Sequence, residues 1–185
     1  MKLGPDGLLQ GVRQVASPNC DERPAGSEIS LLVLHSISLP PGEYGGDAIE
    51  RLFTNRLDPD AHPYFQEIHL TRVSTHFLVR RGGELVQFVP ATARAWHAGA
   101  SSWRGRSPCN DFSVGIELEG TDDSAFEAIQ YRRLCELVDV LRATLPLRDI
   151  AAHSDIAPGR KTDPGAHFDW ARLLADLSQQ ALHRT

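Results

Sequence analysis

The 185-residue sequence contains no long apolar stretch. No segment approaches the roughly 18 consecutive apolar residues that a membrane-spanning helix requires. No apolar core of the signal-peptide kind follows Met1 and Lys2 either. These two absences predict a cytoplasmic protein that has no membrane as its partner.

Cysteine and positive charge are also scarce. The three cysteines, Cys20, Cys109 and Cys135, are widely spaced and form no C-x-x-C pair, which excludes a disulfide scaffold and a cysteine zinc cluster. Lysine and arginine total 19 against 24 aspartate and glutamate residues, and the net charge is −5. With no basic cluster, this balance argues against nucleic acid as a partner.

The composition is sufficient for a chain that folds alone. Hydrophobic residues make up 41% of the sequence, and a chain of this size buries roughly two-thirds of the surface that its unfolded form exposes. No obligate protein partner is therefore expected. We predict one domain over residues 1–185, in which residues 1–28 form a surface arm with one brief helical turn.

Hydrophobic periodicity predicts an α/β fold. Residues 29–35 contain an uninterrupted apolar run, which is typical of a central strand covered on both faces. Residues 112–119 alternate strictly between apolar and other side chains, as in a strand with one buried face. We expect a mixed central β-sheet flanked by helices. The other predicted elements are a hairpin (75–79 and 84–89), helices (47–53, 125–144 and 170–177), a strand (150–153) and a long loop (58–72).

Three candidate metal ligands lie at or after the ends of predicted strands, where sites gather in α/β sheets. They are His35, His153 and, ten positions further on, Asp163. A His/His/Asp set gives Zn²⁺ three ligands and leaves one position open for water. The same ligand types hold Fe(II) in oxygenases. A single histidine at a strand end is also often only a hydrogen-bonded structural residue.

Two charged residues add to this pattern. Lys161 lies two positions before Asp163 and would stabilise an oxyanion if it reached over the metal. Glu117 lies on the polar face of the strand 112–119, two residues after Gly115, where the missing side chain leaves room for a close approach. A carboxylate that faces a metal-bound water is a suitable general base. We interpret Glu119, on the same face, as a rim carboxylate.

Five segments of the chain, in order, resemble the zinc-dependent N-acetylmuramoyl-L-alanine amidases of cell-wall recycling. This group lies within the peptidoglycan-recognition superfamily, and the resemblance runs from about residue 17 to residue 170. Five separate blocks in the right order are far more specific than one motif. The segments are HSISLPPG (35–42), HPYF (62–65), RAWHAG (94–99), CNDFSVGIELEGTD (109–122) and HSDIAPGRKTDPG (153–165).

The resemblance implies a fold, a cofactor and a reaction. It implies an amidase-type α/β fold and a Zn²⁺ ion held by His35, His153 and Asp163. Glu117 would be the catalytic carboxylate and Lys161 the electrostatic stabiliser of the transition state. The implied substrate is a small muropeptide, a 1,6-anhydro-N-acetylmuramic acid with a short stem peptide, cut at the amide between the lactyl group and L-alanine.

Five further residues are predicted to contact the substrate. Trp96 offers a flat apolar face for a sugar, although packing in the core is as common for an indole. Arg72 would meet the stem-peptide carboxylates. Ser36 stands where close relatives commonly have asparagine, and its shorter hydroxyl would hold the peptide more weakly. The other two are Tyr64 and His97, while His62, His69, His76 and His167 are interpreted as structural or surface histidines.

Two alternatives compete with the amidase. Some members of the superfamily lose a zinc ligand and only bind muropeptides, whereas all three ligand positions are filled here. A non-haem iron oxygenase would use the same ligand types, but such enzymes commonly have a jelly roll of many short strands. The long helical segments predicted for this chain disfavour that fold.

Overall fold

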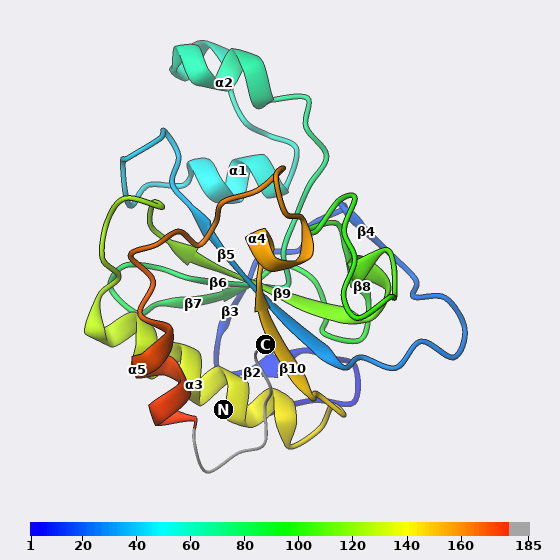
Figure 1. The fold of residues 1–185 in the computed structure, drawn as a ribbon. Helices are drawn as coiled ribbons and strands as arrows, with labels where there is room; N and C mark the ends of the chain where they lie inside the picture. Colours follow the sequence, from blue (N-terminus) through cyan, green and yellow to red (C-terminus); the bar gives the residue numbers. More distant parts are fainter. Residues whose placement is uncertain (178–185) are drawn as a thin grey trace.

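A computed structural model describes residues 1–177. At its centre is a six-stranded sheet in the order β10-β5-β9-β6-β7-β3, visible in Figure 1. β6 and β7 pair antiparallel, whereas the other neighbouring strands run parallel. The predicted mixed sheet is therefore confirmed. The strands are β3 (Arg13–Gln14), β5 (Leu31–Ile37), β6 (Phe77–Val79), β7 (Leu85–Gln87), β9 (Ser113–Glu119) and β10 (Asp149–Ala152).

Helices cover both faces of the sheet. α3 (Ala128–Arg142) and α5 (Trp170–Asp176) pack their apolar side chains against one face, in a cluster that includes Leu134 and Ile116. α1 (Ala48–Phe53) covers the other face. Burial of these two apolar layers is the main stabilising term of the fold. Among residues 1–177, no helix has the length and apolar character needed to cross a membrane.

β9 separates its side chains as the sequence pattern predicts. Val114, Ile116 and Leu118 are fully buried in the layer beneath α3. Successive side chains of a strand point to opposite faces, so Gly115 and Glu117 lie on the other face. Glu117 therefore faces away from the apolar layer under α3.

The predicted long loop over 58–72 is wrong, because this segment contains two short helices. Asp58 accepts a hydrogen bond from the backbone of the 3-10 helix η1 (Pro59–Ala61), and His62 Nδ1 accepts one from Tyr64 N, 3.1 Å away, at the start of α2 (Pro63–Ile68). Proline at the first helical position favours both starts. In Figure 1, α2 projects from the rest of the molecule.

The helical turn predicted within residues 1–28 is also wrong. These residues form short strands: β1 (Lys2–Leu3) pairs with β2 (Leu9–Gln10), and β4 (Cys20–Asp21) pairs with β8 (Arg94–Ala95). The side chains of Leu3 and Leu9 are buried in the main core. The apolar residues of this arm thus anchor it to the body without a helix.

Three parallel strands bring the predicted site together. Because β5, β9 and β10 are parallel and adjacent, their carboxyl ends meet at one edge of the sheet. His35 in β5 is paired in register with Glu117 in β9. His153 follows directly after Ala152, the last residue of β10, and begins the one-turn helix α4 (His153–Ile156).

Candidate active site

Three side-chain atoms converge at this edge of the sheet. His35 Nδ1 lies 2.9 Å from His153 Nδ1 and 3.2 Å from Asp163 Oδ2, and the latter two atoms are 3.0 Å apart. Ligand atoms around a tetrahedral zinc ion with bonds of about 2.0–2.1 Å lie about 3.3 Å from one another. The cluster thus has the donor atoms and the size of a zinc site. The structure brings together the three predicted ligands.

The chain after α4 folds back to deliver Asp163. Ser154 N donates a hydrogen bond to the backbone oxygen of Asp163 at 3.1 Å, and Lys161 N donates to Ala157 O at 3.1 Å. The first bond ties Asp163 to the helix that carries His153, and the second closes a turn within the proline- and glycine-rich segment 157–165. The proline and glycine residues predict that regular secondary structure is interrupted there. The resulting chain reversal places the Asp163 carboxylate beside the end of β10.

The electrostatics of the cluster suit a cation. Burial lowers the pKa of His35 to about 4, against the opposing effect of Asp163. Burial by itself disfavours the charged form of Asp163, but the contacts with His153 and His35 hold the pKa of that carboxyl below its ordinary value. At neutral pH the cluster therefore contains an uncharged His35 ring and an ionised carboxylate, the states that metal ligands need.

The outer nitrogens of both histidines have protein partners. His35 Nε2 lies 2.9 Å from His97 Nδ1, and His97 Nε2 lies 3.0 Å from Ser113 Oγ. His153 Nε2 donates to Ala98 O at 3.2 Å. Both ring nitrogens of His97, a predicted substrate contact, are thus engaged with other side chains, although the residue also lines the cavity described below.

Glu117 carries a buried carboxylate oxygen that lacks a partner within the described part of the chain. Its Oε2 is buried and accepts no hydrogen bond from any described residue. Burial raises the pKa of Glu117 well above its ordinary value, the charge of Asp163 adds to this effect, and Lys161 opposes it. Unpaired buried polar atoms are rare in folded proteins and often mark function.

A cavity of about 780 Å³ opens over these groups. Of the residues predicted from the sequence, Lys161, Ser36 and Tyr64 line it together with Glu117 and the three candidate ligands. Lys161 is exposed at its wall. Ser36 Oγ donates to Asp122 Oδ1 at 3.0 Å. The cavity is large enough for a small ligand that carries a sugar and a short peptide.

Two predicted substrate contacts lie outside the cavity lining. Arg72 is exposed and donates to His69 O at 3.3 Å, whereas its neighbours Thr71 and Val73 line the cavity. Trp96 is half-buried, and its Nε1 is buried without a hydrogen-bond partner among the described residues. The roles of Arg72 and Trp96 in substrate binding stay predictions.

The interpretation of Glu119 as a rim carboxylate is wrong, because only 2% of the residue is exposed. Its carboxylate accepts hydrogen bonds from Arg80 Nη1 at 3.1 Å, Arg81 N at 3.0 Å and Gly45 N at 2.7 Å. The β6–β7 hairpin and the loop before α1 cover this end of β9. The alternation within one strand did not show that other segments close over its end.

The sequence analysis missed Asp122. Its carboxylate bonds to Ser36 Oγ at 3.0 Å and to Thr162 Oγ1 at 2.5 Å. Ser36 follows the candidate ligand His35, and Thr162 precedes the candidate ligand Asp163, so Asp122 joins the two segments that carry these residues. Asp122 lies inside one of the five resembling segments, but nothing in its spacing indicated its partners.

The sequence is similar to those of known amidases. Residues 25–166 match the family model described as N-acetylmuramoyl-L-alanine amidase. The chain belongs to this amidase family. It is 53% identical over 176 residues to the 1,6-anhydro-N-acetylmuramyl-L-alanine amidase AmpD of Escherichia coli K12. The aligned region covers 94% of this chain and 96% of the relative. The predicted amidase is therefore confirmed.

Solved structures of amidases share the fold. A crystal structure of a selenomethionine AmpD derivative superposes with a TM-score of 0.91 at 53% identity, covering 95% of this chain and 99% of that one. The AmiD amidase of E. coli, solved with anhydro-N-acetylmuramic acid-L-Ala-D-γ-Glu-L-Lys, gives a TM-score of 0.58 at 29% identity over 85% and 65% of the two chains. The predicted amidase fold is confirmed.

Proposed function

We propose that this protein is a zinc-dependent hydrolase of peptidoglycan recycling. It cleaves the amide between the lactyl group and L-alanine of 1,6-anhydro-N-acetylmuramyl peptides. The name of the AmpD relative supports this substrate, as does the muropeptide in the AmiD complex. The cavity above the three converging atoms has room for such a small molecule. The cytoplasmic location stays a prediction.

The observation that carries the proposal is that the outer nitrogens of both histidines contact hydrogen-bond acceptors, which assigns their protons to the side away from the three converging atoms. Ser113 Oγ donates its hydrogen to Cys109 O at 2.6 Å, so it accepts from His97 Nε2. A neutral His97 then has a lone pair at Nδ1, which accepts the proton of His35 Nε2. His35 Nδ1 is left with a lone pair that points into the cluster.

The same argument applies to the second histidine. The carbonyl oxygen of Ala98 can only accept, so His153 carries its proton on Nε2 and its lone pair on Nδ1. Two lone pairs and the ionised oxygen of Asp163 thus meet at 2.9–3.2 Å. Such an arrangement repels itself unless a cation lies between the atoms, and zinc prefers these donors.

The residues around the cluster have separate roles in the proposed amide hydrolysis. Bound zinc would supply a Lewis acid and lower the pKa of a coordinated water to about 7. Glu117 accepts a proton from the water that attacks the amide carbonyl, and it returns this proton to the nitrogen of L-alanine as the C–N bond breaks. Its raised pKa makes Glu117 a stronger base for the first step. Lys161 stabilises the negative charge that develops on the carbonyl oxygen.

A non-catalytic muropeptide-binding module would need neither a complete ligand set nor a base. The Glu117 oxygen Oε2, which has no partner among residues 1–177, and the presence of all three candidate ligands support the enzyme. Ser36 and Tyr64 line the cavity and are proposed to contact the substrate. His97, Trp96 and Arg72 are further contacts predicted from the sequence.

Mass spectrometry of 1,6-anhydro-N-acetylmuramyl-tripeptide tests this proposal, with zinc content measured on the same samples. We expect the wild type to release the anhydro sugar and the free tripeptide. We expect Asp163→Ala to lose both tight zinc binding and cleavage, whereas Asp123→Ala, from the same cavity wall, keeps zinc. One zinc ion retained per Asp163→Ala chain would refute the ligand set. Intact substrate with zinc-bound wild type would favour the binding module.

A further inference from the structure

We propose that two consecutive residues, His97 and Ala98, act as an outer bracket that orients both histidine ligands of the metal. This inference rests on the proposed zinc site and adds positioning residues to it. The bracket is defined as the His97 side chain and the Ala98 carbonyl group. Neither takes part in the proton transfers or the charge stabilisation proposed for amide hydrolysis.

The bracket reaches both ligands at the nitrogen that faces away from the cluster. His97 Nδ1 lies 2.9 Å from His35 Nε2, and Ala98 O accepts from His153 Nε2 at 3.2 Å. The two ligands come from different places in the chain, one within β5 and one after β10. Partners of this kind fix the tautomer and the ring orientation of a histidine ligand and raise its basicity.

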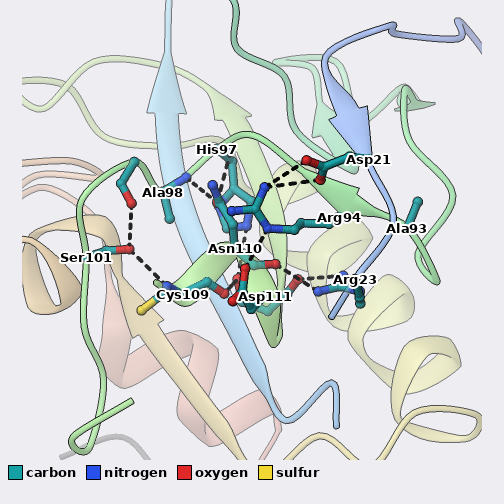
Figure 2. A network of polar contacts seen from close by, with 12 residues as sticks. Asp21, Arg23, Ala93, Arg94, His97, Ala98, Ser101, Cys109, Asn110 and Asp111 are labelled. Carbon is teal, nitrogen blue, oxygen red and sulfur yellow. Dashed lines mark hydrogen bonds and ion pairs between the residues drawn. The ribbon is translucent and has the colours of Figure 1, made fainter. Parts of the chain in front are cut away.

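Asn110 and Arg160 fix the position of the bracket through hydrogen bonds to its backbone. Asn110 Oδ1 accepts from His97 N at 3.2 Å and from Ala98 N at 2.8 Å, as Figure 2 shows. Arg160 donates a further hydrogen bond to Ala98 O at 2.7 Å. Only 6% of Asn110 is exposed. One buried amide oxygen therefore fixes the backbone of both bracket residues.

Gly115 makes room for the His97 ring. A Cβ atom at position 115 would lie 2.6 Å from Cγ and 2.7 Å from Nδ1 of His97, which is too close for any side chain. The ring thus packs directly on the backbone of β9, where Ser113 Oγ meets its Nε2 at 3.0 Å. The close approach expected at Gly115 is that of His97.

His97 therefore acts through His35. Its ring nitrogens contact His35 and Ser113, and 8% of the residue is exposed. The effect of the bracket should appear first in metal affinity, because a ring that is free to rotate binds the ion with a larger loss of entropy. This makes His97 a positioning residue.

The experiment measures the zinc affinity of chelator-stripped protein by competition with a chromophoric chelator. We expect His97→Leu to bind zinc about 10–100-fold more weakly than the wild type. His97→Asn keeps an acceptor near the position of Nδ1 and should recover most of this loss. The visible spectrum of the cobalt-substituted protein should change in the leucine variant and return toward wild type in the asparagine variant.

His76→Asn is the matched control for the loss of a buried histidine. His76 is fully buried and accepts a hydrogen bond from Gly115 N at 3.0 Å, but it makes no hydrogen bond to His35, His153 or Asp163. We expect this variant to keep wild-type zinc affinity. Thermal unfolding of each metal-free variant shows whether it is folded.

Wild-type zinc affinity in a folded His97→Leu protein would overturn the bracket while leaving the proposed function intact. Absence of zinc binding by the wild type would overturn the zinc site itself. If His97→Leu does not fold, Gly115→Ala decides, because it keeps every hydrogen-bonding group and displaces only the ring. Weaker zinc binding by folded Gly115→Ala supports the bracket, and unchanged affinity refutes it.

Discussion

The two carboxylates at the end of β9, the buried Glu119 and the partly buried Glu117, have opposite surroundings. Around Glu119, the β6–β7 hairpin and the loop before α1 supply one arginine and two backbone N–H groups to its carboxylate. Around Glu117, two residues earlier on the same face, Oε2 is buried and has no hydrogen-bond partner among residues 1–177. Arg80 also bonds to Glu50 at 2.6 Å and extends the satisfied region into an ion network.

The difference in surroundings indicates that Glu119 stabilises the fold and that Glu117 is available for proton transfer. A buried carboxylate with donors on all sides fixes the segments around it and has no capacity left for a substrate. A carboxylate with a buried oxygen that lacks a partner costs stability, and it is retained where its proton affinity is used. Glu117 and Glu119 are indistinguishable in the sequence pattern. Substituting each one and measuring both turnover and stability tests whether their roles differ.

The largest expected effect is on catalysis by Glu117→Gln. We predict that the turnover number falls about 10²–10⁴-fold, because a neutral amide cannot accept the proton of the attacking water. Zinc content and the melting temperature should stay at or above wild type, since the change removes an unsatisfied carboxylate. Steady-state kinetics of the zinc-loaded protein measure this, and full activity would refute the base assignment.

The next effect in size is on folding, from Glu119→Gln. This change removes a charge that accepts from Arg80, Arg81 N and Gly45 N. We predict that the free energy of unfolding falls by about 3 kcal/mol. Urea denaturation measures it, with Glu117→Gln as the control from the same strand face. An equal loss of stability in both variants would erase the contrast between the two regions.

The buried side chain of His76 makes the stability of the fold depend on pH. Burial lowers the pKa of His76 to about 3, and the nearby charge of Arg23 adds to the shift. Between pH 6.5 and 3 the unfolded chain thus binds a proton that the folded chain does not. Stability is complete above pH 6.5 and is lost as the pH falls.

We therefore predict that metal-free wild type loses about 2 kcal/mol more stability than His76→Asn between pH 7 and pH 5. Urea denaturation of both proteins at the two pH values gives the difference. Equal losses in the two proteins would show that His76 is not held neutral by its surroundings.

The smallest expected effect is that of Ser36→Ala. It removes one hydrogen bond to Asp122 and leaves the three candidate ligands in place. We predict a loss of about 1 kcal/mol in the free energy of unfolding and unchanged zinc affinity. Calorimetric zinc titration and thermal melting test this, and a large loss of zinc affinity would mean that Asp122 positions His35 through Ser36.

Much of this arrangement could be predicted from the sequence because local patterns encode it. The apolar run of β5 and the alternation of β9 are each complete within one segment, so they fixed the strands that carry His35 and Glu117. Residue types at strand ends indicated the three candidate ligands, and the resemblance to the amidases implied that they hold zinc. The helices η1 and α2 were missed because their only local signal was proline, which also marks turns.

The partners of these residues could not be predicted, because they depend on contacts between distant segments. Asn110 reaches the backbone of His97 because η2 (Cys109–Asp111) packs beside β8. Glu119 and Glu117 differ only in what covers them. The position of Ser113 on the same strand face as Glu117 was visible in the alternation, but its bond to His97 was not.

The most direct test of the account is a zinc titration of chelator-stripped wild type, with cleavage of 1,6-anhydro-N-acetylmuramyl-tripeptide followed in parallel. The account predicts no cleavage without metal and a rate that rises linearly to a plateau at one zinc ion per chain. Full cleavage by the stripped protein, or one tightly bound zinc ion per chain without any cleavage, would contradict it.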